Sequence, residues 1–261
     1  MTSPILVTGG TGTLGRLVVR RLRDAGHPVR VLSRRAREAA DGVTFLTGDL
    51  VRGEGIEPAL AGVTAIVHCA SDKKGDDVAT GNLVRAAQAQ AVPPHLVYPS
   101  IVGVDAVSFG YFQSKRECER IVSESGLPWT MLRVTQFYDL VYRGTRKLAR
   151  LPVIPVPAGF RCQPIDPADV ATRLVELALG APAGRVPDLG GPDVTSWEDL
   201  TRRYLRATNR RRAILPLWMP GLGKIKAGGL LVGDQPDGGI PAGRRTWEDF
   251  LSERLNEQPA N

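Results

Sequence analysis

A glycine-rich stretch near the N-terminus has the spacing of a phosphate-binding turn. Its glycines recur every three residues, between the apolar run 5–8 and a stretch with apolar residues at helical spacing. A glycine at a strand end permits a tight turn, a second lets the backbone approach a diphosphate, and a third lets helix and strand pack closely. The following helix offers free N–H groups and the positive end of its dipole. We therefore predict a dinucleotide-binding turn, rather than a purely structural one, formed by Gly9, Thr11, Gly12, Thr13, Leu14 and Gly15.

The residues after the second predicted strand indicate which dinucleotide binds. Proteins that bind NAD often place an acid there for the ribose 2′-hydroxyl, whereas this chain has Ser33, Arg34 and Arg35. Two guanidiniums can bind a 2′-phosphate, so we predict NADP(H) in preference to NAD(H). The alternative is that the arginines are solvated surface. Asp49 and Leu50, after the third predicted strand, are expected at the adenine, although Asp49 could equally cap the next turn.

Strands and helices alternate along the chain. This alternation implies an α/β fold with a Rossmann-like, doubly wound parallel sheet, in which ligands bind beyond the carboxyl ends of the strands. We expect residues 1–134 to form this NAD(P)-binding core and residues 135–261 a smaller, partly interwoven C-terminal substrate lobe within one structural unit. The predicted strands are 5–8, 29–33, 43–46, 65–68, 96–98 and 129–133, and the predicted helices are 13–25, 76–90, 111–125, 167–179 and 195–208.

The composition is that of a globular protein. The 261 residues are 43% hydrophobic and carry a net charge of +7. No apolar run approaches the roughly 18 residues that span a bilayer, and no leader precedes the first apolar run, so we expect a cytoplasmic protein. The basic residues are interspersed with acids and no recognition-helix or zinc-finger pattern accompanies them, so we expect neither nucleic acid nor membrane as a partner.

The cysteines and histidines lack the spacing of a metal site. No two cysteines form a CxxC pair, and the three histidines have no zinc-ligand spacing. Because the number of cysteines is odd and no signal sequence is evident, a disulfide framework is not expected. We predict no metal and interpret Cys69, Cys118 and Cys162 as reduced, structural residues.

Several motifs resemble the short-chain dehydrogenase/reductase superfamily. They are TGGTGTLG at 8–15, GDL at 48–50, HCAS at 68–71, SIVG at 100–103 and YFQSK at 111–115. The stretch SGLPWTMLRVTQF at 125–137 resembles its atypical, NmrA-like NAD(P)H-binding branch. The stretch IDPADV at 165–170 resembles the segment by which that branch returns from its substrate lobe. The resemblance extends to about Pro192 and is not specific to a substrate.

The resemblance implies a catalytic role for Tyr111 and Lys115, which match the family's YxxxK. Four residues apart on a helix, they share a face, and a lysine ammonium near a tyrosine favours the ionised phenol. Lys115 would also hold the nicotinamide ribose, and Ser100, placed just after the fifth strand, would hydrogen-bond the substrate carbonyl. The alternative for Tyr111 is a packing aromatic at the helix start. Cys69, Ala70 and Ser71 would run along the cofactor, mainly through backbone contacts.

Residues after the sixth predicted strand are expected where nicotinamide and substrate meet. Gln136, Phe137 and Tyr138 are candidates for the pocket wall, with core packing as the alternative for the two aromatic residues. The stretch 215–243 is rich in glycine and proline but also in apolar residues. It could be a lid, an oligomer contact or a segment packed on the second lobe. The oligomeric state is left open.

Together these features predict an NADPH-dependent oxidoreductase. Hydride would pass from the cofactor to a small carbonyl or quinone substrate, with Tyr111 supplying the proton. One alternative is an NADP(H)-sensing interaction protein of the NmrA-like type, which binds the cofactor without turnover. Another is an epimerase or dehydratase that retains its cofactor.

Overall fold

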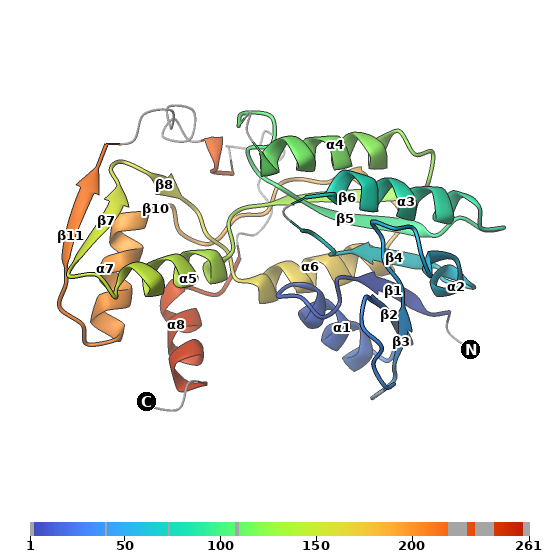
Figure 1. Ribbon diagram of the computed structural model, residues 1–261, viewed down its shortest axis with the longest axis horizontal. Helices are drawn as coiled ribbons and strands as arrows, with labels where there is room; N and C mark the ends of the chain where they lie inside the picture. The colour runs from blue at the N-terminus through green and yellow to red at the C-terminus, as the bar shows by residue number, and fades with distance from the viewer. Residues whose placement is uncertain are drawn as a thin grey trace. The chain divides into compact units, whose positions relative to one another are not determined.

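The chain folds into two compact units (Figure 1). The computed structural model describes residues 3–39, 41–72, 74–107, 110–218, 229–232 and 243–257. The first unit comprises Met1–Arg133 and Val170–Val186, and the second comprises Val134–Asp169 and Pro187–Asn261. The chain therefore leaves the first unit one residue before the predicted boundary. It returns for residues 170–186, which had been assigned to the C-terminal lobe.

A seven-stranded sheet forms the centre of the first unit, in the order β3-β2-β1-β4-β5-β6-β9. The described registers are all parallel. Chain order reverses between β1 and β4, which is where such sheets open a crevice at their carboxyl ends. The predicted fold class is confirmed. The strands are β1 (Ile5–Thr8), β2 (Val29–Ser33), β3 (Val43–Thr47), β4 (Ala65–His68), β5 (His95–Ile101), β6 (Trp129–Val134) and β9 (Gly184–Arg185).

Helices cover both faces of this sheet. In Figure 1, α3 and α4 lie over one face and α1 and α6 over the other. Leu6, Ile66 and Leu96 of the strands pack with Leu83 of α3 and Val122 of α4 in one buried core. Burial on both faces explains why the strands read as continuous apolar runs. The helices are α1 (Gly15–Asp24), α2 (Ile56–Leu60), α3 (Asp76–Gln88), α4 (Tyr111–Ser123) and α6 (Pro167–Leu179).

The second unit has its own hydrophobic core and two small sheets. Strands β7 (Val153–Pro157) and β11 (Ala213–Leu217) pair in parallel, and β8 (Arg161–Cys162) pairs antiparallel with β10 (Thr195–Ser196). The core lies among the helices and is rich in aromatic side chains, Trp247 being 1% exposed. The helices are α5 (Tyr138–Leu148), α7 (Trp197–Ala207) and α8 (Trp247–Asn256).

Sequence reasoning missed the helices α2, α5 and α8 and the strands β8, β9, β10 and β11. For α8 a signal was present, since Thr246 and Asp249 form a capping box at its start.

Within the described ranges, none of the helices is long and apolar enough to cross a membrane. Most of the stretch 215–243, which the sequence singled out, lies outside the described residues, namely 219–228 and 233–242.

Arg133, near the end of β6, ties that strand to α4 through a buried ion pair. Its Nε and Nη2 donate to the two carboxylate oxygens of Glu119 at 2.8 and 2.5 Å, and Nη1 donates to Asp105 at 2.6 Å. The side chains of Arg133 and Glu119 are 9% and 11% exposed, whereas that of Asp105 is 62% exposed. The buried bidentate ion pair between Arg133 and Glu119 fixes the position of α4, the helix that carries Tyr111 and Lys115.

We predict that Glu119→Gln lowers the free energy of unfolding by about 3 kcal/mol, because it leaves a buried guanidinium without its charged partner. Asp105→Asn is the matched control and should cost about 1 kcal/mol at most, since that pair is solvated. Urea unfolding of both variants measures the difference. Equal losses would contradict the assignment of the buried pair as the main restraint.

Candidate active site

The turn between β1 and α1 needs glycine at two positions for steric reasons. Gly9 has a φ of +65°, and a Cβ there would lie 2.6 Å from the Ala70 nitrogen. A Cβ on Gly15 would lie 2.2 Å from the Gly9 carbonyl oxygen. At Gly12 a Cβ would meet only that same oxygen, at 3.2 Å, so this part of the turn stays open. Gly9 and Gly15 therefore close the turn, and Gly12 leaves space for a ligand.

The start of α1 fits the diphosphate of a dinucleotide. Its first turn holds no acidic residue, and no side chain caps its N-terminus. Thr11 and Gly12 are exposed, Thr13 is half-buried and Leu14 is buried, so Leu14 can offer only backbone groups. The positive end of a helix suits phosphate oxygens, which backbone N–H groups at such a helix start can bind.

The segment after β4 lies against this turn. The Cys69 nitrogen donates to the Thr8 carbonyl at 3.1 Å, and the Ala70 nitrogen donates to the Thr8 hydroxyl at 3.4 Å. The close approach of Ala70 to Gly9 is part of the same contact between this segment and the glycine turn. Burial raises the pKa of Cys69 to about 12, so its thiol stays protonated. The structure thus brings the two predicted cofactor-binding segments together within the first unit.

A buried histidine connects this edge to α3. Thr8 Oγ1 lies 2.6 Å from Nδ1 of His68, whose Nε2 lies 3.1 Å from Thr80 Oγ1. Thr80 donates its proton to the Asp76 carbonyl at 2.7 Å, so Nε2 of His68 is the donor and Nδ1 accepts from Thr8. Burial, aided by the charge of Lys115, lowers the pKa of His68 from 6.5 to about 3. The ring is therefore a neutral link in a directed hydrogen-bond chain.

Lys115 is buried on α4 beside an acid that sequence reasoning did not single out. Its Nζ lies 3.5 Å from Oδ2 of Asp76, and both side chains are 5% exposed. The same Nζ donates to the Tyr98 hydroxyl at 3.2 Å and lies 5.6 Å from the centre of the Tyr111 ring. The ammonium thus stands between a buried carboxylate and two phenol rings. In the sequence alone, an acid at the first position of α3 indicates only the start of a helix. The pairing of Asp76 with Lys115 becomes evident only in the folded structure.

Asp76 also orders the loop that precedes α3. Its Oδ1 accepts from the Asp72 nitrogen at 2.5 Å, and its Oδ2 accepts from the Ser71 hydroxyl at 2.7 Å. The Ser71 oxygen in turn lies 3.3 Å from the Tyr111 hydroxyl. Ser71, predicted for the cofactor, is therefore the serine in contact with Tyr111. Asp76, Ser71, Lys115 and Tyr111 form one polar cluster.

Two tyrosines flank Lys115, and their environments differ. Tyr98 is 1% exposed, and burial raises its pKa well above the ordinary value, so its hydroxyl stays protonated and inaccessible. Tyr111 begins α4 and is 43% exposed. Only Tyr111 of these two can reach a ligand from solvent.

The predicted place of Ser100 is wrong. Strand β5 continues to Ile101, so Ser100 lies inside the strand rather than after it. It is 1% exposed, and its Oγ has no hydrogen-bond partner among the described residues. The predicted strand 96–98 ended too early, because the chain stays extended through Pro99. Ser100 is not brought into contact with Tyr111.

The arginines predicted for the 2′-phosphate are exposed at the end of β2. Arg34 lies 3.8 Å from Asp72 in a solvated pair, and Arg35 has no ion pair among the described residues. Ser33 holds this turn, its hydroxyl donating to the Arg35 carbonyl at 2.9 Å.

Asp49 caps the next turn, which was the alternative reading for this residue. Its Oδ1 accepts from the nitrogens of Val51 and Arg52 at 2.8 and 3.2 Å. Leu50 packs against the core of the first unit, and its carbonyl accepts from Asn82 at 2.7 Å.

The residues predicted for the substrate wall belong to the second unit. Tyr138 is 2% exposed, its ring packs at a tilt against that of Trp247 with 5.3 Å between the ring centres, and its hydroxyl donates to the Arg245 carbonyl at 3.2 Å. It therefore takes the core-packing alternative. Phe137 and Gln136 are half-buried, and Nε2 of Gln136 donates to the Leu230 carbonyl at 3.3 Å.

Comparison with known proteins identifies relatives of this chain. Residues 9–179 match a protein family described as NAD(P)H-binding. The (4-alkanoyl-5-oxo-2,5-dihydrofuran-3-yl)methyl phosphate reductase of Streptomyces griseus is 33% identical over 215 residues, which are 79% of this chain and 74% of that protein. The Photosystem II assembly factor Ycf39 of Trieres chinensis is 30% identical over 203 residues, which are 72% of this chain but only 63% of that protein.

Solved structures share the fold at lower identity. The NADPH-dependent quinone oxidoreductase QOR2 of Escherichia coli, in complex with NADPH, has a TM-score of 0.79 and 19% identity, covering 97% of this chain and 100% of that one. A nucleoside-diphosphate-sugar epimerase of Staphylococcus aureus has a TM-score of 0.78 and 19% identity, covering 96% of this chain and 99% of that one. These likenesses concern the fold.

We predict that Gly15→Ala prevents the turn from forming, because the new Cβ collides with the Gly9 carbonyl. Gly81→Ala is the control, since a Cβ there meets nothing within 4 Å and alanine gains about 1 kcal/mol in a helix. The thermal midpoint with and without NADPH tests this. It should fall in Gly15→Ala and lose its NADPH-dependent rise, while both persist in Gly81→Ala. A Gly15→Ala protein with the wild-type midpoint would contradict the steric role.

We predict that His68 makes stability depend on pH below 6.5. The folded state keeps the ring neutral, whereas the unfolded state binds a proton, so the free energy of unfolding falls as pH falls, by about 1.4 kcal/mol per pH unit. Denaturant unfolding between pH 7.5 and 5.5 should show a shallower slope in His68→Gln. Subtracting the two slopes removes the contribution of His95, which both proteins share. Identical slopes would mean that His68 is not held neutral.

Proposed function

This chain belongs to the NAD(P)H-binding family of oxidoreductases, in the NmrA-like branch of the short-chain dehydrogenases/reductases, and from this premise we propose that it reduces a small carbonyl or quinone with NADPH. The observation that carries the proposal is the cluster of Tyr111, Lys115, Ser71 and Asp76 beside the glycine turn of the same unit. A protein that only sensed the cofactor would have no need of a solvent-facing tyrosine next to a buried ammonium.

Tyr111 is the proposed proton donor. The bound cofactor supplies a hydride, and reduction of a carbonyl then requires one proton at its oxygen. The exposed hydroxyl of Tyr111 delivers that proton, and the Lys115 ammonium stabilises the phenolate that remains. Ser71 holds the hydroxyl in place through its 3.3 Å contact.

Asp76 is a proposed positioning residue. It touches neither substrate nor cofactor in this scheme but holds Lys115 and the Ser71 hydroxyl at once. Because the pair is buried, the carboxylate restricts Lys115 to one place. The glycine turn holds the diphosphate, and the backbone of residues 69–71 lies along the cofactor.

The preference for NADPH rests on Arg34 and Arg35. Both are exposed at the end of β2, where a 2′-phosphate is expected, and the guanidinium of Arg35 has no ion pair among the described residues. Arg34 shares its charge with Asp72, so Arg35 is the stronger contributor in this proposal.

The alternative of a cofactor-sensing protein has one specific observation in its favour. A relative with 30% identity is named an assembly factor rather than an enzyme. In such a protein the same cradle would bind NADPH without turnover. In either case we expect the protein in the cytoplasm.

The decisive experiment is NADPH oxidation with a panel of acceptors. The panel contains quinones, ketones, aldehydes and the dihydrofuranone phosphate ester on which the Streptomyces griseus relative acts, with NADH as the comparison. We predict turnover with NADPH, and a loss of roughly 100-fold or more in carbonyl reduction in Tyr111→Phe. Quinone reduction should suffer less, since its reduced oxygens need less acid catalysis. If the folded protein binds NADPH but reduces none of the acceptors, the result would favour the alternative of a cofactor-sensing protein.

The cofactor preference has its own variants. Replacing both Arg34 and Arg35 by alanine should lower kcat/KM for NADPH by about tenfold or more and leave that for NADH nearly unchanged. Arg37→Ala is the matched control, because this exposed arginine lies over Phe45 rather than at the strand end. An equal loss of kcat/KM with NADPH and with NADH would show that the arginines do not bind the 2′-phosphate.

A further inference from the structure

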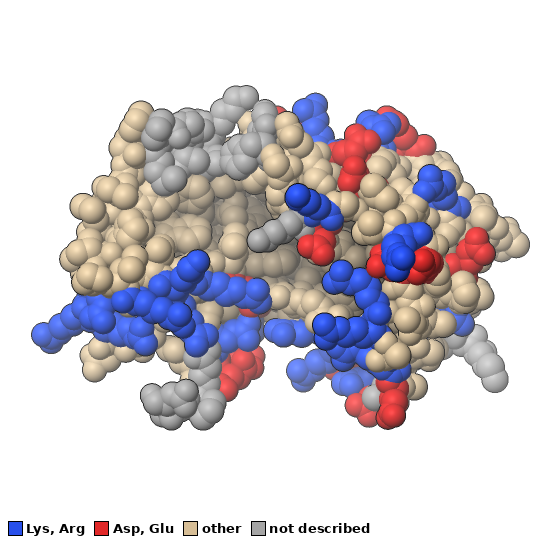
Figure 2. Space-filling view, viewed as in Figure 1, with Lys and Arg blue, Asp and Glu red and all other residues tan. Residues whose placement is uncertain are grey.

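The second unit contains a pocket of about 1040 Å³ whose described lining is dominated by arginine. It is open to solvent and lies wholly within that unit, whereas the glycine turn lies in the first. Figure 2 shows basic side chains gathered in a band over the region of α5 and α7. The lining consists of Arg150, Pro152, Arg202, Leu205, Arg206, Arg210, Arg211, Arg212, Ala213 and Ile214.

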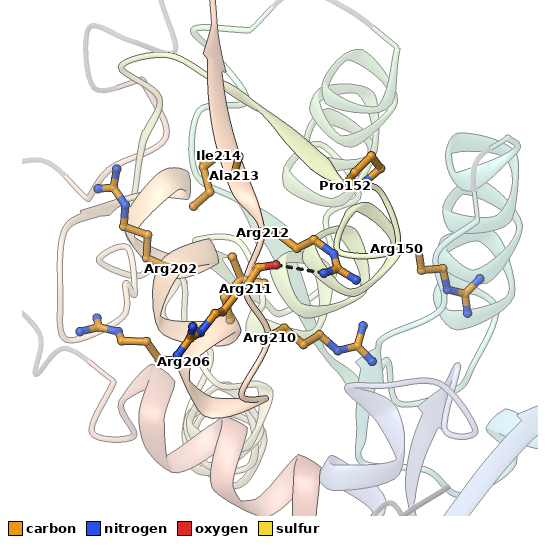
Figure 3. Close-up of a pocket in the computed structure, with 10 residues that line it drawn as sticks. Arg150, Pro152, Arg202, Arg206, Arg210, Arg211, Arg212, Ala213 and Ile214 are labelled. Atoms are coloured by element: carbon orange, nitrogen blue, oxygen red, sulfur yellow. Dashed lines mark hydrogen bonds between the residues drawn. The ribbon is translucent and has the colours of Figure 1, made fainter.

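Backbone structure brings these arginines together from separate parts of the chain. Strands β7 and β11 pair in parallel with Ala213 opposite Val153, so the segments that enter them, 150–152 and 210–212, lie side by side. Asn209, at a φ of +48°, turns the chain after α7, and the Arg210 nitrogen closes that turn on the Leu205 carbonyl at 2.9 Å. Figure 3 shows Arg210 and Arg212 extending in the same direction from this segment.

Most of these positive charges are not neutralised. Arg202 pairs with Glu198, but Arg150, Arg206, Arg210 and Arg211 have no ion pair among the described residues. No acid occurs in the sequence between residues 140 and 165 or between 200 and 217. A cation in the last turn of a helix, such as Arg206 in α7, interacts favourably with the negative end of the helix dipole. This interaction does not explain the three consecutive arginines at 210–212, which follow the helix. Unpaired like charges around a hollow repel one another unless an anion binds there.

We propose that this pocket binds a small soluble molecule with two or more linked phosphate groups. Guanidinium forks match phosphate oxygens in geometry and charge, and Arg210 and Arg212, which Figure 3 shows extending to the same side, suit neighbouring phosphates. The volume is of the size of small-molecule sites, and Leu205 and Ile214 give it an apolar wall. No aromatic side chain lines it among the described residues, which removes the stacking platform of single-stranded nucleic-acid sites. The proposal is independent of the reductase activity.

Titration calorimetry with sodium tripolyphosphate, on the full chain without NADPH, tests the site. NADPH is left out because it carries linked phosphates itself, and the arginine variants distinguish this pocket from the glycine turn. We expect saturable binding that weakens as salt is added. Arg210→Gln combined with Arg211→Gln should weaken it by about tenfold or more, since two charge-assisted hydrogen-bonding groups are lost.

The control is Arg85→Gln combined with Arg161→Gln, which removes the same charge from exposed positions outside the pocket. Its affinity should equal that of the wild type. Two outcomes would overturn the proposal: no saturable binding, or equal loss in both double variants. A protein that ignores tripolyphosphate but sediments with phosphatidylglycerol vesicles or shifts a single-stranded RNA would also overturn it, in favour of a membrane or nucleic-acid surface.

Discussion

The buried ion pair between Asp76 and Lys115 is the constraint on which the first unit's site depends. Two charges that are each 5% exposed persist only if further partners satisfy them. Asp76 finds these partners in the loop after β4, and Lys115 finds them in Tyr98 and Tyr111. One pair therefore joins the start of α3, the face of α4 and the edge along which the cofactor is expected.

The same network is continuous with the glycine turn. The hydrogen-bond chain through His68 runs from the Asp76 carbonyl to Thr8, and Thr8 holds the segment against which Gly9 packs. A neutral histidine suits this position because it donates on one side and accepts on the other without adding a charge beside Lys115. The glycine turn and the polar cluster are thus parts of one hydrogen-bonded arrangement.

The fold was predictable from sequence because the central strands β1 and β4 are buried along their whole length and read as short apolar runs between turn residues. Tyr111 and Lys115 were predictable because they match the YxxxK motif of the family that the sequence resembles, and this spacing puts them on one helix face. Asp76 was not, since its partner lies 39 positions away on another helix and nothing in a single sequence links them. Ser100 was misplaced because the predicted strand 96–98 ended too early, whereas β5 continues to Ile101. The second unit resisted prediction because its short strands and aromatic core follow no regular alternation.

The most direct test of the central claim is a double-mutant cycle on carbonyl reduction, with Asp76→Asn, Tyr111→Phe and the two combined. If Asp76 acts by holding Lys115 and Ser71 against Tyr111, Asp76→Asn should lower kcat by roughly tenfold or more in the wild type. It should have little further effect once the Tyr111 hydroxyl is gone, so the free energies of activation would be strongly non-additive. Additive losses, with both single variants folded, would show that Asp76 serves stability alone and that the cluster is not a catalytic unit.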